Sequence, residues 1–202
     1  MTKFYYVLIL IILSGCSVLN NEFDQLKLSN YRVVKIHNNI DELSHPTNII
    51  HLNNIEMLFE LDSIRNEVFT WSTKDGVSLK LIDGKVIKTT NLEHDFNIIN
   101  YRGYKEDLSN YSTFIRFRNP DSGFLEIFFS YEIVKEGTKK RRGNDVNYKY
   151  RLVKEDFKVP LISWSGVNYY WIDENNSVLV SKQILDPFGK KIRIESLKEY
   201  SD

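Results

Sequence analysis

The sequence contains one cysteine, and its position points to a covalent modification. Cys16 follows Leu13-Ser14-Gly15, and the ten residues Phe4–Leu13 are all apolar and come shortly after a basic residue, Lys3. A basic start, a short apolar core and small residues before a cleavage point are typical of a secretory signal peptide. Leu13-Ser14-Gly15-Cys16 also fits the bacterial lipobox, in which the cysteine becomes the lipidated first residue. We therefore expect Cys16 to carry acyl chains, palmitate among them, that hold the protein on a membrane.

This interpretation divides the chain into three parts. Residues 1–15 form a cleaved signal peptide, residues 16–30 a polar, lipidated tether, and residues 31–202 the folded domain. The apolar core spans only about 15 Å as a helix, which is too short for a bilayer core of about 30 Å. Ser17 stands where an aspartate would retain a lipoprotein at the inner membrane. We therefore expect an outer-membrane lipoprotein that faces the periplasm.

The strongest charge feature is the basic run Lys139-Lys140-Arg141-Arg142. It is either a solvated loop tip or a contact for anions such as lipid phosphates or an acidic polysaccharide, and such binding would depend on salt. The whole chain carries 27 basic and 27 acidic residues, so its net charge is zero. A nucleic-acid-binding protein would carry a clear basic excess, so we expect no nucleic-acid partner.

Tryptophan side chains offer flat apolar faces that can stack on sugar rings. Trp71 and Trp171 are our candidates for such glycan contacts. In a β-rich protein, large aromatic residues more often fill the core or pack against the sheet. The sequence leaves both roles open for these two residues.

Residue patterns for catalysis are missing from the sequence. It contains no G-x-S-x-G, P-loop, G-x-G-x-x-G or H-E-x-x-H motif, and lipidation would remove the thiol of Cys16 as a nucleophile. Glu126 and Glu132 share one face of an expected strand, but they are roughly 20 Å apart. Glycosidases need carboxylates about 5–10 Å apart, so these two cannot form a catalytic pair. We expect no catalytic residue, no cofactor and no metal.

Short alternating apolar runs and turn signals indicate strands throughout the domain. Asp75-Gly76 and Asp83-Gly84 predict hairpin turns. Phe124–Val134 predicts the longest strand, with every second residue from Leu125 to Ile133 on its buried face, and residues 136–147 predict a polar loop after it. Residues 54–62 fit either a strand or a helix. The pattern indicates a single all-β domain, an antiparallel barrel or sandwich.

Two segments of the sequence resemble a known family. The first contains Phe69, Trp71, the turns Asp75-Gly76 and Asp83-Gly84, and Lys85-Val86-Ile87-Lys88-Thr89. The second contains Tyr170-Trp171, Ser181-x-Gln183-x-Leu185-x-Pro187 and Ile194-Glu195-x-Leu197-Lys198. In this order, together with the lipobox, they resemble the YjbF/GfcB family of bacterial lipoproteins, which is linked to group 4 capsule and exopolysaccharide production. The resemblance implies an all-β, barrel-like fold, a role in making or exporting a surface polysaccharide, and no established catalytic residues.

Three functional hypotheses follow from this resemblance. The first is a non-enzymatic accessory lipoprotein that supports capsule or exopolysaccharide production or export, in contact with export proteins or an acidic polysaccharide. The second is a periplasmic enzyme that modifies the polysaccharide, and the third is a structural lipoprotein of the envelope without a glycan role. We favour the first because the sequence lacks a recognisable nucleophile, metal-binding set or close carboxylate pair.

Overall fold

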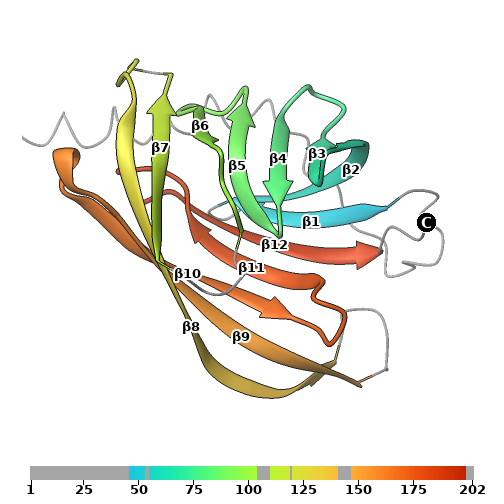
Figure 1. The fold of residues 1–202 in the computed structure, drawn as a ribbon. Helices are drawn as coiled ribbons and strands as arrows, with labels where there is room; N and C mark the ends of the chain where they lie inside the picture. Colours follow the sequence, from blue (N-terminus) through green and yellow to red (C-terminus); the bar gives the residue numbers. More distant parts are fainter. Residues whose placement is uncertain (1–45, 53–54, 104–109, 119, 141–146, 199–202) are drawn as a thin grey trace, which may run out of the picture. The chain divides into compact units, whose positions relative to one another are not determined.

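The computed structural model describes residues 46–52, 55–103, 110–118, 120–140 and 147–198, except for the side chains of residues 139, 140, 197 and 198. The expected signal peptide and tether, residues 1–30, lie outside the described residues. The described part forms one closed antiparallel barrel of twelve strands (Figure 1). In chain order the strands are β1 (Thr47–Leu52), β2 (Ile55–Arg65), β3 (Val68–Ser72), β4 (Ser78–Ile82), β5 (Lys85–Thr90), β6 (Phe96–Ile99), β7 (Tyr111–Phe117), β8 (Leu125–Lys140), β9 (Asn147–Val159), β10 (Trp164–Ile172), β11 (Val178–Ile184) and β12 (Lys191–Lys198), with a short 3-10 turn, η2 (Pro160–Ile162), before β10.

The strands follow one another around the ring in chain order. Each strand pairs with the strand before and after it, and β1 pairs with β12 to close the barrel. The prediction of an all-β, antiparallel, barrel-like domain is therefore confirmed. The segment that fitted either a helix or a strand is β2, with Met57 and Phe59 buried as strand alternation requires.

In the described part of the chain, no helix is both long enough and apolar enough to cross a membrane.

Both predicted hairpin turns are confirmed. Asp83 and Gly84 form the two-residue loop between β4 and β5, and both have positive φ angles, 49° and 71°. This loop type favours Asp-Gly because glycine has no Cβ to clash in that conformation. At Gly84 the available space also requires glycine, since a Cβ there would approach Val178 to 2.6 Å. Asp75-Gly76 lies in the loop between β3 and β4, where Gly76 has a φ of 83°.

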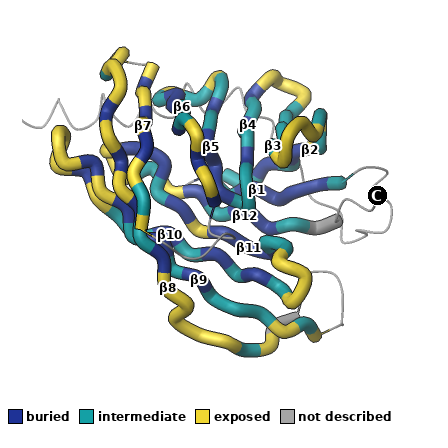
Figure 2. The backbone as a smooth tube through the Cα atoms, in the orientation of Figure 1, coloured by how far each residue is buried: buried dark blue, intermediate teal, exposed yellow. Residues whose placement is uncertain are grey.

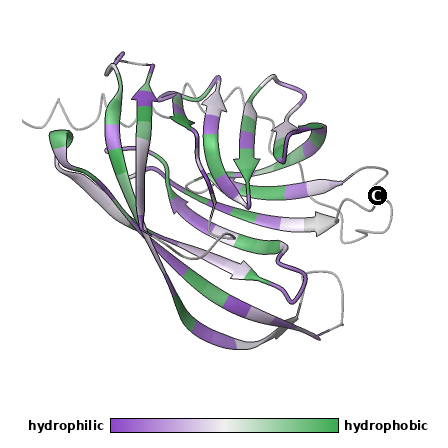
Figure 3. Ribbon diagram, viewed as in Figure 1, coloured by the Kyte–Doolittle hydropathy of each residue, from purple (hydrophilic) through white to green (hydrophobic). Residues whose placement is uncertain are grey.

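Alternation along the strands builds the core, and Figure 3 shows it as bands of opposite hydropathy along β8 and β9. On β8, Leu125, Ile127 and Phe129 face inward and are at most 4% exposed. Ile133, predicted on the same face, is instead 45% exposed. The pairing of β8 with β9 is regular up to Ile133, which is aligned with Val153, and the register shifts only between Ile133 and Lys135. The alternation of the strand therefore holds at Ile133, but its side chain is not covered there.

The prediction of a loop over residues 136–147 was wrong at both ends of that range. β8 continues to Lys140, and its backbone pairs with β9 up to Asn147, the first residue of β9. From residue 132 to residue 138, β8 is largely exposed on both faces, and the facing part of β9 is mostly half-buried (Figure 2). An alternating apolar pattern is therefore not needed on β8 there. Its strand conformation depends on backbone pairing with the neighbouring strand, which polar side chains do not signal.

Side chains fill the barrel interior around the middle of the strands. Tyr170, Phe59 and Phe129 are among the largest fully buried residues. An internal pocket beside Phe157 and Gln183 measures about 10 Å³, which is near the minimum for one water molecule. This region is a packed core rather than a chamber for a ligand.

Candidate functional site: a buried charge cluster and an outer groove

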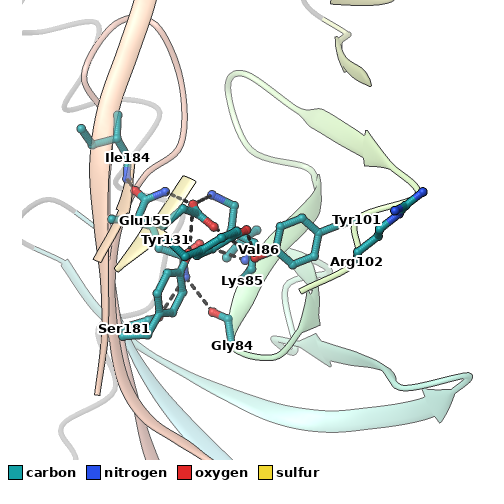
Figure 4. A network of polar contacts seen from close by, with 12 residues as sticks. Gly84, Lys85, Val86, Tyr101, Arg102, Tyr131, Glu155, Ser181 and Ile184 are labelled. Carbon is teal, nitrogen blue, oxygen red and sulfur yellow. Dashed lines mark hydrogen bonds and ion pairs between the residues drawn. The ribbon is translucent and has the colours of Figure 1, made fainter. Parts of the chain in front are cut away.

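The chemistry-bearing side chains form two groups on opposite sides of the barrel wall. The inner group is centred on Glu155 of β9, whose carboxylate has no solvent exposure. Lys85, at the start of β5 and 4% exposed, donates a hydrogen bond to Glu155 Oε1 over 2.7 Å (Figure 4). A lysine and a glutamate in contact could exchange a proton with a substrate, so access to this pair decides whether it is catalytic.

Hydrogen bonds from neighbouring side chains satisfy the Glu155 carboxylate. Oε1 also accepts from Asn168 Nδ2 at 2.6 Å and from the Tyr170 hydroxyl at 3.3 Å, and Oε2 accepts from the Tyr101 hydroxyl at 3.1 Å. Buried charges that are paired and fully hydrogen-bonded are stable in a protein interior. With packed side chains around it, this cluster holds β5, β9 and β10 together and has no space for a substrate.

Burial also keeps the tyrosines of this cluster neutral. The Tyr131 hydroxyl donates to the Tyr101 hydroxyl at 3.1 Å. Burial, followed by the charge of Glu155, raises the pKa of both Tyr101 and Tyr131 well above the usual 10.0. Burial raises the pKa of Tyr111 to about 12. At neutral pH these phenols therefore act as hydrogen-bond donors and acceptors rather than as bases.

Gln183 of β11 joins the two segments that carry the family resemblance. Its Oε1 accepts a hydrogen bond from the Val86 backbone N–H at 2.9 Å, and its Nε2 donates to the Gly84 carbonyl at 2.7 Å. Nε2 also donates to Ser181 Oγ at 2.9 Å. The side-chain amide thus binds the backbone of β5 across the interior, 97 residues away in the sequence. The Gly-Lys-Val and Ser-x-Gln motifs therefore form a single structural contact.

The outer group begins with Lys154, the residue before Glu155. Its ammonium contacts Glu132 Oε1 and Asp156 Oδ2, each at 2.9 Å, and these hydrogen bonds raise the pKa of Lys154. The two carboxylate oxygens are therefore at most about 6 Å apart, a limit that includes the roughly 5–5.5 Å of a retaining glycosidase pair. The side chains of Glu132 and Asp156 are 56% and 44% exposed, and both accept from the ammonium. A glycosidase pair must flank the bond that it cleaves, whereas here the Lys154 ammonium bridges the two carboxylates, so this arrangement does not match that chemistry.

A groove of about 720 Å³ crosses the outer face of β7–β10 beside this charge cluster, and we call it the outer groove. Tyr111, Phe129, Phe157 and Gly166 are aligned across the four strands by the strand register. Phe129 and Phe157 point into the core, so their backbone forms the floor of the groove. The outward-facing residues on either side form its walls. One wall contains Ser112, Phe128, Lys158 and Ser165, and the other contains Ser130, Asp156 and Val167.

The two candidate glycan-stacking tryptophans occupy different environments. Trp71 of β3 is 7% exposed and belongs to the core, so its ring is not accessible to a glycan. Trp171 of β10 is half-buried on the outer face, with its ring centroid 6.5 Å from that of Tyr169. Lys182 Nζ lies 5.6 Å from the centroid of the Trp171 ring. Trp171 therefore remains a candidate contact, on the same face of β10 as the outer groove.

The remaining predicted site residues fall at or beyond the limits of the described residues. Lys139 and Lys140 end β8, but their side chains are not described, and Arg141, Arg142 and Cys16 lie outside the described ranges. The anion contact and the lipid attachment therefore stay predictions. Among the residues that the structure describes, no group of three or more His, Cys, Asp or Glu side chains could hold a metal ion.

Comparison with known proteins assigns the chain to a family. Residues 21–197 match the model of the family described as group 4 capsule polysaccharide lipoprotein gfcB, YjbF. The chain belongs to the YjbF family. This confirms the resemblance carried by the two sequence segments, and membership of a lipoprotein family indicates a place in the cell envelope. No curated protein matches the sequence.

Two solved structures are similar to this YjbF-family chain. The crystal structure of the hypothetical lipoprotein YmcC from Escherichia coli (K12) has a TM-score of 0.68 and 17% identity, and the match covers 89% of this chain and 95% of YmcC. At this identity the likeness supports the fold. A putative lipoprotein from Parabacteroides distasonis ATCC 8503 has a TM-score of 0.39 and 11% identity, over 74% of this chain and 91% of its own.

Sequence reasoning missed both Glu155 and the outer groove. A signal for Glu155 was present, because it alternates with Val153 and Phe157, which are apolar and buried, while Lys154 and Asp156 face outward. A glutamate at the inward position of such a strand indicates a buried charge that needs a partner. The groove gives no comparable signal, since its walls come from four strands and are aligned only by the register.

Proposed function

We propose that this YjbF-family lipoprotein is a non-enzymatic accessory factor in capsule or exopolysaccharide production or export. The observation that carries the proposal is the division between the two groups of reactive side chains. The Lys85–Glu155 cluster lies in a packed interior that a substrate cannot enter, whereas the outer face of β7–β10 has a groove lined by exposed polar residues and Phe128. Such a protein acts by contacting partners through its outer surface, and the family supports the polysaccharide context.

The proposed location is the periplasmic side of the outer membrane, with a lipid anchor at Cys16. The lipobox supports the anchor, and the lipoprotein family supports a place in the envelope. In the variant Cys16→Ala, we expect the protein to leave the membrane fraction or to keep its signal peptide. Unchanged membrane fractionation together with an unchanged mass of the mature protein would overturn this part of the proposal.

The proposed partners are polysaccharide-export proteins or an acidic polysaccharide, contacted through the outer face. Trp171 and the basic run at residues 139–142 are the contacts that the sequence suggests. Each exposed ion pair contributes about 0–1 kcal/mol, so neutralising all four basic residues should weaken binding moderately and reduce its salt dependence. The circular dichroism spectrum should remain unchanged, because the run begins at the end of β8, after the buried residues of that strand.

Deletion of the gene tests the function directly. We expect less capsule or exopolysaccharide at the surface of the deletion strain, with restoration by the wild-type gene. The measurement is the amount of extracellular polysaccharide under conditions in which the gene is expressed. If the deletion strain exports normal amounts under those conditions, the whole assignment fails.

The proximity of Glu132 and Asp156 gives the enzymatic alternative a specific site to test. The purified lipoprotein should leave the molecular mass and composition of the polysaccharide unchanged after prolonged incubation. The variants Glu132→Gln and Asp156→Asn serve as controls, because each removes one carboxylate of the exposed cluster. If the wild-type protein degrades or modifies the polysaccharide and either variant does not, the non-enzymatic proposal is wrong and this pair is the active site.

A further inference from the structure

We infer that the outer groove is a binding site for a saccharide chain, which lies across strands β7–β10 with one sugar ring against Phe128. This inference rests on the proposed function and adds the place and the manner in which the glycan is held. The outer groove is distinct from the tryptophan site suggested by the sequence, since Trp171 does not line it.

The size of the groove fits a short stretch of polysaccharide. Its volume of about 720 Å³ lies within the range of small-ligand sites, roughly 300–1,000 Å³. It crosses four strands, and with neighbouring strands about 4.8 Å apart its length is about 14 Å, or roughly three sugar rings.

The wall residues supply the contacts that sugars require. Phe128 is 42% exposed, so a face of its ring is available for the C–H groups of a sugar, and such aromatic contact favours binding. Ser130 lies in the opposite wall and Ser165 lies two strands further along the same wall, and their hydroxyl groups can donate to and accept from sugar hydroxyls. Asp156 can accept further hydrogen bonds from sugar hydroxyls, since its side chain is 44% exposed.

Lys158 suits an acidic saccharide in particular. It is exposed in the same wall as Phe128, to which it is aligned across β8 and β9. Its ammonium forms no salt bridge with any residue in the described ranges, whereas Lys154 on the same strand is already engaged by two carboxylates. A carboxylate on a sugar ring next to the one stacked on Phe128 would therefore meet the exposed ammonium of Lys158.

The groove floor disfavours a peptide as the occupant. β8 and β9 are each paired on both sides, so their backbone N–H and C=O groups are already hydrogen-bonded. An added peptide strand needs a free sheet edge, and the closed barrel offers none at this place. The groove must therefore recognise its ligand through side chains, as a site for sugar rings would.

The test measures binding of full-length lipoprotein in detergent to the purified exopolysaccharide of the producing strain and to short fragments made by its partial acid hydrolysis. Phe128→Ala should weaken binding by at least about tenfold in isothermal titration calorimetry. Ser165→Trp should also weaken it, because the larger side chain fills the groove.

Phe188→Ala is the matched control: its ring is 74% exposed, but it lies between β11 and β12 and outside the groove. Lys158→Gln should reduce the salt dependence of binding.

Loss of binding in both groove variants, with unchanged thermal midpoints and with normal binding by Phe188→Ala, supports the inference. Absence of binding by the wild-type protein, or equal binding by the wild type and both groove variants, overturns it. A change in self-association alone, measured by analytical ultracentrifugation, also overturns it, since the groove would then be a contact between copies. If the groove variants restore full polysaccharide export to a deletion strain that needs the gene, the proposed function stands and the groove inference fails. If the deletion has no effect on export, the proposed function fails.

Discussion

Lys154 and Glu155 are neighbours on β9, yet they belong to charge clusters on opposite sides of the barrel wall. Glu155 faces inward and contacts Lys85 at 2.7 Å, while Lys154 faces outward and contacts Glu132 and Asp156 at 2.9 Å. The contact distances are nearly equal, so the geometry of the ion pairs does not distinguish the clusters. Their exposure does, since Glu155 is fully buried and the outer carboxylates are about half exposed.

This difference determines what each cluster can do. A charge inside the barrel has lost its water, so it depends on its protein partners, and removing one of them leaves the other uncompensated. Outside the barrel, water and salt ions replace a lost partner at little cost. The inner cluster therefore contributes to the stability and arrangement of the strands. The charged groups of the outer cluster can instead change partners and contact a ligand.

The largest effect should come from breaking the inner ion pair. Lys85→Met leaves the buried carboxylate of Glu155 without its cation and should lower the free energy of unfolding by about 3–5 kcal/mol. Urea denaturation followed by circular dichroism measures this change. Lys154→Met is the matched control on the outer face, and its denaturation midpoint should stay close to that of the wild type. If both variants lose the same unfolding free energy, the difference in burial does not determine how much each cluster contributes to stability.

The same comparison applies to two tryptophans, one inside and one outside. Trp71→Ala should cost about 3–5 kcal/mol of unfolding free energy, as truncation of a large buried aromatic residue does. Trp171→Ala should cost clearly less, because the ring is half-buried and water can occupy the space that it leaves. Thermal and urea denaturation of both variants measures the difference. If Trp71→Ala leaves the free energy of unfolding nearly unchanged, the ring is not buried, and Trp71 again becomes a candidate for glycan stacking.

Removing the amide of Gln183 tests the contact between the two family motifs. Gln183→Leu keeps much of the volume but leaves the Val86 N–H and the Gly84 carbonyl without their partner. Leaving buried polar groups unsatisfied costs about 1–3 kcal/mol. Lys182→Leu is the control, because this neighbouring residue is exposed on the outer face. If both variants unfold at the same urea concentration, the amide bridge adds nothing to stability.

The smallest effect should appear at an exposed ion pair far from the core. Arg116 donates two hydrogen bonds to Asp121, and these bonds lower the pKa of the carboxyl from its ordinary 3.8 to about 2. Because the folded-state pKa is lowered, any stabilisation is present above about pH 4 and is lost as the pH falls toward 2. NMR titration of Asp121 should show this low pKa, and Arg116→Ala should return it to the ordinary range with little change in the denaturation midpoint. An unchanged pKa in the variant would show that the arginine is not the cause.

The regular parts of this fold follow from local sequence, and the exceptions follow from distant contacts. Asp83-Gly84 predicted its turn correctly because the two residues alone determine which φ angles are accessible. The end of β8 could not be predicted in the same way, since residues 136–138 are largely exposed and such a segment carries no apolar alternation. Its conformation depends on a partner strand that the local sequence does not specify.

The candidate sites depend even more than the strands on contacts that the local sequence does not specify. The sequence motifs around Gly84 and Gln183 were visible separately, but only the closed barrel shows that they bind each other. Trp71 and Trp171 look alike in the sequence, and their positions on opposite faces separate a core residue from a surface residue. The outer groove needs the register of four strands, so nothing in a single segment could reveal it.

The pairing of β1 with β12 also constrains when this domain can fold. Thr47 is aligned with Lys198, so the ring closes between two segments that are about as far apart in the domain as the chain allows. Contacts between such distant segments form slowly, because a long loop must be ordered before they are made. A chain delivered with its N-terminus first therefore has an open sheet until the last strand arrives. During that interval the free edges of β1 and of the newest strand are exposed to aggregation, so the incomplete barrel is at greater risk than the closed one.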